Sequence, residues 1–358
     1  MESIKTELPM VSGIPNDKTF PAVVTPVRKK RFALSPALFG WVLATVGLLW
    51  VLHDLDLGQM ARQMANMKWS WLVLAIACDV LSYVCQGVRW RLLLTPVGNV
   101  STLRSTQAIY AGLFTNELLP MRLGELVRAY LVARWTAAKF VTVLPSIVVE
   151  RFFDTLWMVV AIGLAALFMP LPPELLKAAD VLGVIVVIAA AALLYFAVNQ
   201  RYTARLQQAQ QSHRQAVRLI AGLLLRLSEG MRGIGRTRAF YFSLLWSLAL
   251  LVFQALAFWL VMLAFGLSVS FQIGLAVFLI VHLGTAIPNA PANIGAYQFF
   301  TVLGLTLFGV DKATAASFSI EVFLILTLPL LLLGFIAIST SGTSLLKIRR
   351  ELQDIKAQ

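Results

Sequence analysis

The chain has 358 residues, of which 59% are hydrophobic and 13% are charged, and its net charge is +13. Soluble domains are usually about a quarter charged, so this composition excludes an ordinary soluble enzyme. No Asp, Glu, Lys or Arg occurs between Ala239 and Val310. That stretch must cross or enter a bilayer more than once, because one spanning helix needs only about 20 apolar residues. We therefore expect an all-α integral membrane protein.

Taken in chain order, six apolar segments are long enough for full transmembrane helices. They are residues 37–53, 69–86, 141–168, 181–198, 239–265 and 314–340. Two further apolar segments, 106–134 and 271–310, contain Pro, Asn and Gly near their centres. We expect each to be a re-entrant hairpin of two half-helices, since irregular backbone at membrane depth is tolerated only inside protein or around a wet cavity. The alternative is that each segment forms two ordinary spans.

The positive charge lies mainly on one side of these segments. The regions before residue 37, at 87–105, at 199–238 and beyond 340 hold 21 Lys and Arg, whereas the connections at 54–68, 169–180, 266–270 and 311–313 hold four. By the positive-inside rule, the protein is multi-pass in the cell membrane with both termini in the cytoplasm. Because the charge flanks membrane segments, we expect no nucleic-acid partner.

Three regions follow from this topology. A basic, disordered N-terminal tail, 1–36, and a C-terminal tail, 341–358, flank a polytopic membrane domain at 37–340. Within that domain, Arg alternates with Leu, Ile and Val in the cytoplasmic segment 199–238. This pattern favours an amphipathic helix on the inner leaflet, and a solvated connecting helix is the alternative.

The first interrupted segment places charges, a proline and a glycine at membrane depth. Pro120 lacks an amide proton and favours a helix that begins just after it, near Met121. The free amides at such a helix start attract phosphate. The charged residues that follow are spaced three apart and share one helix face, where they bind or balance a phosphate or simply pair with one another. The candidate substrate-binding residues here are Asn116, Pro120, Arg122, Gly124, Glu125 and Arg128.

A second charged group lies inside the predicted span 141–168. Glu150 and Asp154 are one turn apart and share a face, whereas Arg151 points about 100 degrees away. We expect both acids to face the interior and to pair with an arginine of the first hairpin. In an alternative reading, one of them carries a transported proton. Glu321 is another candidate carboxylate, for which a hydrogen-bonded core role is the alternative.

The second interrupted segment has no charge at its centre. Pro288 and Pro291 break the helix, and Asn293 can cap a new one that begins near Ile294. This helix start and that of the first hairpin would face one cavity, which favours an anion. A tight membrane turn is the alternative. The further candidate substrate-binding residues are Pro288, Pro291, Asn293 and Gly295.

The order of elements predicts an internal repeat. Residues 69–168 and 239–340 each consist of a span, a hairpin and a span, and the two units have opposite orientations. Inverted repeats with broken helices are the layout of many transporters.

The residues that could hold a metal or perform catalysis are scattered. His53, His213 and His282 are far apart, and no HExxH, P-loop or GxSxG pattern occurs. His282 is interpreted as a hydrogen-bonded packing residue. We therefore expect no metal, no cofactor and no catalytic residues.

Several motifs occur in order along the chain. They are Arg89-Trp90-Arg91, Asn116, Leu119-Pro120, Arg122, Gly124-Glu125, Arg128, Val149-Glu150-Arg151, Asp154, Pro288, Pro291 and Gly295. Together they resemble the lysylphosphatidylglycerol synthase transmembrane-region family, also called flippase-like membrane proteins. The resemblance implies a polytopic fold related to the lipid-translocating half of the bifunctional members. Gln298 departs from the acid expected after the glycine, and the sequence lacks the soluble aminoacyl-transferase domain, so we expect no lysyl transfer.

These inferences favour a flippase that moves a phospholipid or another anionic polar lipid between leaflets, with membrane phospholipids as its partners. Two other classes stay open. A membrane-embedded transferase acting on aminoacyl or glycosyl lipids would use the same carboxylates as acid and base. A non-transport partner of a lipid biosynthetic enzyme would need the fold but not the charges. We expect a transporter rather than an enzyme.

Overall fold

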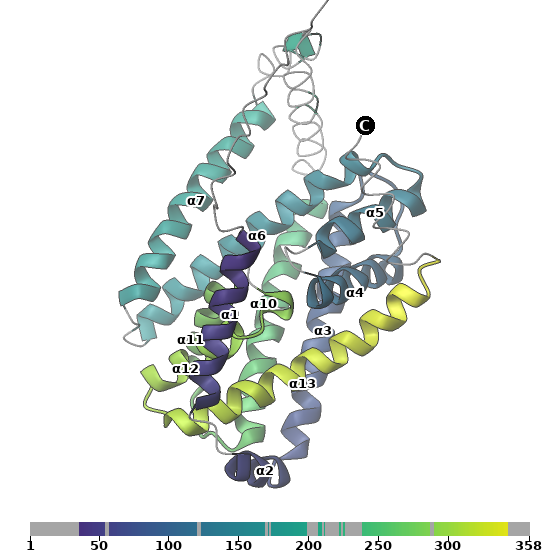
Figure 1. The fold of residues 1–358 in the computed structure, drawn as a ribbon. Coiled ribbons are helices and arrows are strands. Elements are labelled where there is room, and N and C mark those ends of the chain that lie inside the picture. The colour runs from purple at the N-terminus through teal and green to yellow at the C-terminus, as the bar shows by residue number, and fades with distance from the viewer. Residues whose placement is uncertain are drawn as a thin grey trace, which may run out of the picture. The chain divides into compact units, whose positions relative to one another are not determined.

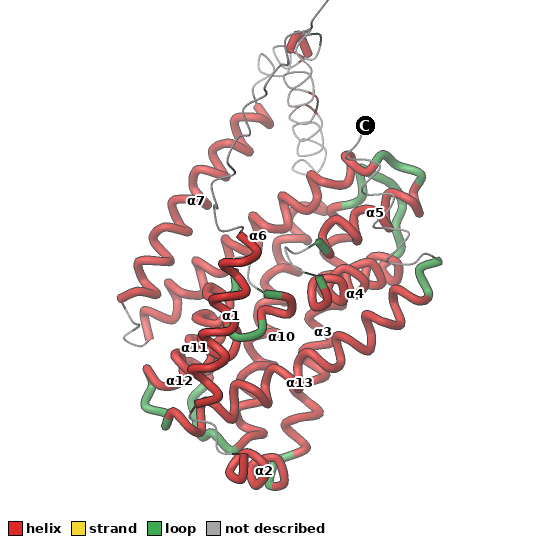
Figure 2. The backbone as a smooth tube through the Cα atoms, viewed as in Figure 1, coloured by secondary structure: helices red, strands yellow, loops and turns green. Residues whose placement is uncertain are grey.

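The computed structural model describes residues 36–53, 57–119, 123–168, 173–198, 238–286 and 290–342, with residue 171 and scattered positions between 207 and 225. Every regular element in these ranges is helical (Figure 1, Figure 2). The helices are α1 Pro36–His53, α2 Leu57–Ala65, α3 Trp69–Leu93, α4 Thr102–Leu118, α5 Gly124–Thr136, α6 Phe140–Phe168, α7 Pro173–Val198, α10 Arg238–Phe265, α11 Phe271–Gly284, η2 Pro291–Asn293, α12 Ala296–Leu307 and α13 Lys312–Ser339. The all-α prediction is confirmed for these ranges, whereas the predictions for both tails and for 199–238 concern residues almost entirely outside them.

Four helices, α3, α6, α10 and α13, are long and apolar enough to cross a membrane. They coincide with four of the predicted spans and support a multi-pass membrane protein. Helices α1 and α7 occupy the other two predicted spans, but α7 begins at Pro173, before the expected start at Val181. The predicted start lies too far along the chain because the exposed residues Lys177 and Asp180 interrupt the apolar pattern. They do not interrupt the helix.

Helix α3 continues to Leu93, beyond the predicted end of its span at Gln86. The additional turns contain Arg89 and Trp90, whose exposed fractions are both 0%. Arg89 therefore belongs to the helix, and its predicted place in the connection after the span is wrong. A count of positive charge treats each arginine as solvated, whereas Arg89 is neutralised inside the protein by two carboxylates.

Each of the two interrupted segments consists of two short helices. In the first, α4 has 17 residues and α5 has 13, and in the second, α11 has 14 and α12 has 12. At 1.5 Å per residue these helices are about 18 to 26 Å long, less than the roughly 30 Å of a bilayer core. Ser101 and Ser270 cap α4 and α11, and each hydroxyl accepts a hydrogen bond from the amide three residues later.

The first unit, α3 to α6, and the second unit, α10 to α13, make equivalent helix contacts. Helices α3 and α10 pack on each other along an extensive interface. Helix α4 packs on α13 of the other unit, and α11 packs in the same way on α6. Within the units, α5 contacts α6 and α12 contacts α13. This exchange of partners is the pattern expected of the predicted repeat.

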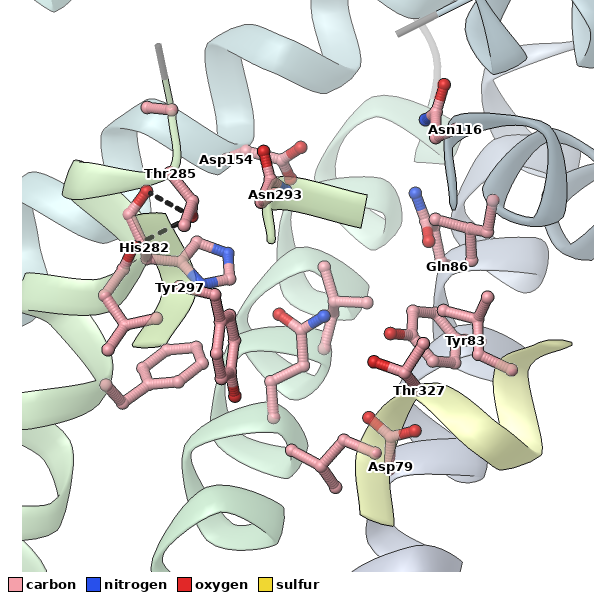
Figure 3. Close-up of a pocket in the computed structure, with 18 of the residues that line it drawn as sticks. Asp79, Tyr83, Gln86, Asn116, Asp154, His282, Thr285, Asn293, Tyr297 and Thr327 are labelled. Carbon is pink, nitrogen blue, oxygen red and sulfur yellow. Dashed lines mark hydrogen bonds between the residues drawn. The ribbon is translucent and has the colours of Figure 1, made fainter. Parts of the chain in front are cut away.

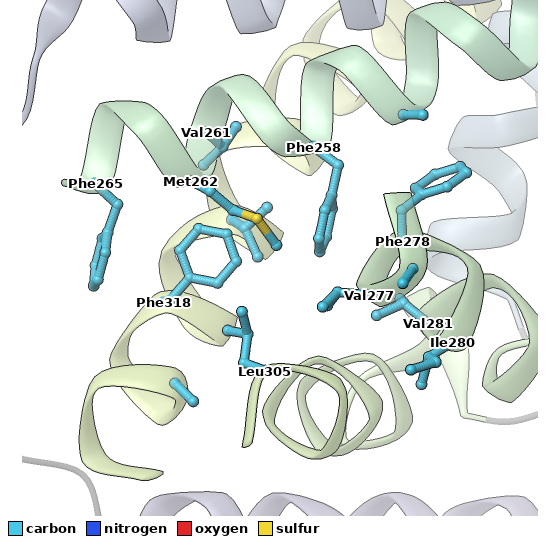
Figure 4. Close-up of a cluster of buried hydrophobic side chains, with 14 of the residues drawn as sticks. Phe258, Val261, Met262, Phe265, Val277, Phe278, Ile280, Val281, Leu305 and Phe318 are labelled. Atoms are coloured by element: carbon cyan, nitrogen blue, oxygen red, sulfur yellow. The ribbon is translucent and has the colours of Figure 1, made fainter. Parts of the chain in front are cut away.

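The apolar core of the second unit is built from aromatic and branched side chains of four helices (Figure 4). The rings of Phe258 on α10 and Phe318 on α13 are perpendicular, with centroids 6.0 Å apart, and Phe278 of α11 lies 6.0 Å from Phe258 on its other side. Lipid is as apolar as these side chains, so close packing rather than exclusion of water holds such helices together. Aromatic pairs contribute about 0.5–1.5 kcal/mol each beyond burial.

Candidate functional site

A cavity of about 440 Å³ lies between the two hairpins and the helices that cross beside them. Its wall includes side chains from α3, α4, α6, α10, α11, α12 and α13. The polar lining residues include Asp79, Tyr83, Gln86, Asn116, Asp154, His282, Asn293, Tyr297 and Thr327, which surround one space (Figure 3). A volume of 300–1,000 Å³ with a few convergent polar groups is typical of a small-molecule site.

Six charged side chains beside this cavity form a chain of alternating sign, which we call the ion ladder. In order they are Arg128, Glu150, Arg89, Asp154, Arg151 and Glu125. They come from α3, α5 and α6, so the ladder joins the first hairpin to the two long helices of its unit. Three cations and three anions give it no formal net charge.

The buried end of the ladder is centred on Glu150. Its Oε1 lies 2.8 Å from Nη2 of Arg89, and Nη1 of Arg128 donates to Oε1 and Oε2 at 2.9 and 3.0 Å. Gln86 Nε2 also donates to Oε1, at 3.0 Å. The Arg89 and Glu150 side chains are 0% exposed, and that of Arg128 is 4% exposed. Buried charges are tolerated only when paired and hydrogen-bonded in this way.

The open end of the ladder lines the cavity. Arg151 is 46% exposed, and its Nη2 lies 2.8 Å from Oε1 of Glu125. Its Nη1 donates to Oδ2 of Asp154 at 3.3 Å. Asp154 also accepts from Arg89, which donates from the same nitrogen to Ser247 Oγ at 3.1 Å. The ladder thus runs from an enclosed carboxylate to an arginine that a ligand can reach.

Arg128 is enclosed by more than its carboxylate. Its guanidinium carbon lies 4.9 Å from the centroid of the Trp90 ring, within the range of a cation–π interaction. The indole nitrogen of Trp90 donates to Ser146 Oγ at 3.0 Å, which fixes the ring. The expectation that an acid of this span pairs with an arginine of the first hairpin is met by Arg128 and Glu150. Contact between Arg128 and a ligand would require this arrangement to open.

In both hairpins a carboxamide accepts a hydrogen bond from the amide of a glycine at the start of the second helix, where Gly124 is the first residue of α5 and Gly295 is the residue before α12. Gly124 N–H donates to Asn116 Oδ1 at 2.7 Å, and Gly295 N–H donates to Gln298 Oε1 at 2.7 Å. Gln298 therefore supplies the acceptor that an acid three residues into a helix supplies in a capping box. At Gly124 the helices touch, because a Cβ there would lie 1.8 Å from the Gly112 carbonyl oxygen.

Both predicted helix starts lie before the observed ones, and α5 begins at Gly124 rather than near Met121. Helix α12 begins at Ala296, and Asn293 lies before it in η2, so the prediction that Asn293 caps a helix starting near Ile294 is wrong. Asn293 has φ 53° and donates its amide to the Ala290 carbonyl, which makes it the end of a tight turn. Its side chain lines the cavity.

The structure brings most predicted site residues together. Asn116, Glu125, Arg151, Asp154 and Asn293 line the cavity, and Arg128 and Glu150 stand behind them in the ladder. Gly124, Pro291 and Gly295 belong to the backbone of the two hairpin tips. Pro120, Arg122 and Pro288 lie outside the described residues.

Several cavity residues were not predicted. Asp79 and Tyr83 of α3 and Thr327 of α13 share one side of the cavity (Figure 3). Asp79, Tyr83 and Gln86 are spaced four and three apart in an apolar helix, a signal that could have identified the face. The His282 ring packs at a tilt against Phe278 with ring centroids 4.6 Å apart, as a packing residue would, but it also lines the cavity.

Comparison with known proteins agrees with this architecture. The sequence profile described as "Lysylphosphatidylglycerol synthase TM region" matches residues 35–334. The chain is 27% identical to a UPF0104 membrane protein of Methanothermobacter thermautotrophicus over 271 residues, which are 70% of this chain and 78% of that protein. No solved structure matches the chain. Because the profile covers most of its length, the protein belongs to the lysylphosphatidylglycerol synthase transmembrane-region family.

Proposed function

We propose that this protein moves a phospholipid or another anionic polar lipid between the leaflets of the cell membrane. The observation that carries the proposal is the polar cavity enclosed by the helices of an otherwise apolar membrane bundle. An open polar cavity contributes no packing contacts to the apolar helices around it. It does offer a lipid headgroup a polar route while the acyl chains stay among lipid.

In this proposal, six helices cross the bilayer and the two hairpins enter it from opposite sides. The shortness of the four hairpin helices supports re-entrant insertion. Contact between α4 and η2 supports a meeting of the hairpins beside the cavity. Many transporters place their substrate site between broken helices of inverted repeats. Both termini are then cytoplasmic.

The headgroup phosphate binds at the open end of the ladder. Arg151 supports this role because it is 46% exposed and lines the cavity, whereas Arg89 and Arg128 are enclosed. A phosphate would compete with Glu125 and Asp154 for the Arg151 guanidinium, which suits bidentate contacts. Arg122, predicted beside the start of α5, is the second proposed phosphate ligand. When the phosphate leaves, the carboxylates of Glu125 and Asp154 pair with Arg151 again.

Leaflet exchange in proteoliposomes tests this function. The purified chain is reconstituted with fluorescent phosphatidylglycerol, and a quencher that does not cross the bilayer reports the lipid in the outer leaflet. We expect faster exchange than in empty vesicles. Exchange no faster than in empty vesicles, with phospholipids of several headgroups, would refute the proposal.

Two substitutions test the site. Arg151→Gln should slow exchange about tenfold or more, the effect of losing one charge-assisted hydrogen bond. Arg134→Gln, at an exposed position in the last turn of α5, is the matched control and should exchange lipid at the wild-type rate. Arg122→Ala tests the second proposed ligand. Wild-type exchange in both Arg151→Gln and Arg122→Ala would show that the phosphate binds elsewhere.

A further inference from the structure

Asp79 is a buried carboxylate on the wall of the cavity and is not part of the ion ladder. It is 5% exposed, and its Oδ2 has no hydrogen-bond partner among the described residues. Tyr83 of α3 and Thr327 of α13 extend their hydroxyl groups toward the same region of the cavity (Figure 3). An intramembrane acid without a counter-ion is a functional feature by default, because membrane proteins rarely retain one otherwise.

The described groups nearest to Asp79 do not supply a positive charge. From α4, Tyr110 and Glu117 lie within electrostatic range of Asp79 or of its neighbour Tyr83, and Tyr297 does so from α12. Within the part of the chain that the structure describes, Glu117 Oε2 has no hydrogen-bond partner either. Two acids outside the neutral ladder therefore share this cavity.

The other helices around the cavity place no unpaired Lys or Arg on its wall among the described residues. Helix α10 presents Ser247 and Gln254 to the cavity and has no Asp, Glu, Lys, Arg or His after Arg238. Helix α13 carries Glu321, another buried acid, and α11 carries the imidazole of His282. Helix α6 contributes Asp154 and Arg151, which already bind each other.

We propose that Asp79 is a proton-binding site and that its protonation drives lipid movement. The coupling of this proton to lipid movement rests on the proposed function. A carboxylate without a counter-ion is costly in this environment, so Asp79 is more stable when a proton binds it. The proton comes from water that enters the cavity on one side of the membrane and returns to water on the other. No bond other than the O–H of the carboxyl group forms or breaks.

Protonation of Asp79 and binding of an anionic headgroup favour each other, because the proton removes a negative charge from the cavity. When Asp79 and Glu117 are both ionised, the cavity repels an anionic headgroup. A proton on Asp79 removes one of these charges and eases entry of the phosphate. By linkage, the bound phosphate raises the affinity for the proton by the same factor. The proton and the lipid headgroup then cross the membrane together.

A polar stripe on α3 connects this site to the ladder. Asp79, Tyr83 and Gln86 follow one helix face over about two turns, roughly 10 Å. Gln86 donates to the buried carboxylate of Glu150 at 3.0 Å. A change of charge at Asp79 therefore acts on the same face of α3 that holds the ladder.

Infrared difference spectroscopy tests the proton site without any need for transport. Protein reconstituted in vesicles of phosphatidylglycerol and phosphatidylethanolamine is moved between acidic and alkaline buffer. We expect a protonated-carboxyl band that disappears in Asp79→Asn, shifts in Asp79→Glu and persists in Asp180→Asn, an exposed acid on α7. Persistence of every carboxyl band in Asp79→Asn, or loss of the same band in Asp180→Asn, would overturn the proton site.

Leaflet exchange under an imposed pH gradient tests the coupling. We expect a gradient that is acidic on the side of lipid entry to speed wild-type exchange several-fold. The exchange rate of Asp79→Asn should not respond to the gradient. An equal response in Asp79→Asn, or a response to a sodium gradient but not to a pH gradient, would overturn coupling through a proton on Asp79. If the band behaves as expected but the wild type exchanges no lipid, the proposed function fails and the proton site stands.

Discussion

The first unit, α3 to α6, and the second unit, α10 to α13, pack through equivalent helix pairs but differ in charge. All six ions of the ladder belong to the first unit. In the second unit, no Asp, Glu, Lys or Arg lies between Ala239 and Val310. Helix packing can therefore be duplicated without duplicating chemistry. The first unit supplies the charged wall of the cavity, whereas the described residues that the second unit contributes to this wall include no Asp, Glu, Lys or Arg.

The hairpins illustrate the same contrast at their tips. Each uses a carboxamide to cap a glycine amide, with a distance of 2.7 Å in both cases. Only the first tip leads into the ladder, through Glu125 and Arg128. Substitutions can separate the helix caps, which both units need for folding, from the ion ladder, which only the first unit contains.

The largest effect is expected from Glu150→Gln, which breaks the buried end of the ladder. It leaves Arg89 and Arg128 without the carboxylate they share and should lower the free energy of unfolding by about 3–5 kcal/mol. Glu125→Gln, at the open end, should cost no more than about 1 kcal/mol. Unfolding of both variants in detergent, followed by circular dichroism, measures the difference. Equal losses would mean that the ladder has no enclosed end.

Gly124→Ala should have the next largest effect, through crowding rather than charge. The new methyl group would meet the Gly112 carbonyl oxygen, so α4 and α5 must separate, at a cost of about 1–3 kcal/mol. Gly163→Ala on α6 is the matched control, because no described atom outside its own stretch of helix lies within 4 Å of its Cβ position. The same unfolding measurement applies. A loss at Gly163→Ala as large as at Gly124→Ala would point to helix insertion and not to hairpin packing.

Asn116→Ala and Gln298→Ala should each cost about 1 kcal/mol, the usual value for a lost helix cap. Gln298→Glu keeps an acceptor for the Gly295 amide and should recover most of the stability. Because Asn116 also lines the cavity, its loss should slow lipid exchange more than that of Gln298. Thermal unfolding and the exchange assay together measure both effects. Equal slowing in both alanine variants would remove the functional difference between the tips.

The smallest effect concerns Asp311, the exposed cap at the start of α13. Its Oδ2 accepts from the Thr314 amide at 2.9 Å, and backbone hydrogen bonds hold the pKa of Asp311 below its ordinary value. A lowered pKa in the folded state gives stability that is complete above the unfolded pKa, near pH 4, and is lost as pH falls through the folded pKa.

Asp311→Asn is the variant that tests this dependence. Asn also caps helices, so the variant should stay folded and lose only the charge-dependent part of the stability. Its unfolding midpoint should lie slightly below that of the wild type at pH 7, and the two should converge below about pH 4. A constant difference across this range would contradict the assignment.

The sequence alone determined the class of the protein, its long helices and the two broken segments. These features are local: apolar length sets a membrane span, and Pro, Gly and Asn interrupt it wherever they occur. It also indicated that the charges of the first unit must be paired, because unpaired charge is costly at membrane depth.

Only the tertiary structure decided which charges meet. It placed Arg89 inside the ladder, enclosed Arg128 against Trp90 and turned Arg151 toward the cavity. It also brought Asp79 and Thr327, from helices far apart in the chain, to one wall. Ion pairing and burial depend on distances between different helices, and no periodicity within one helix encodes those distances.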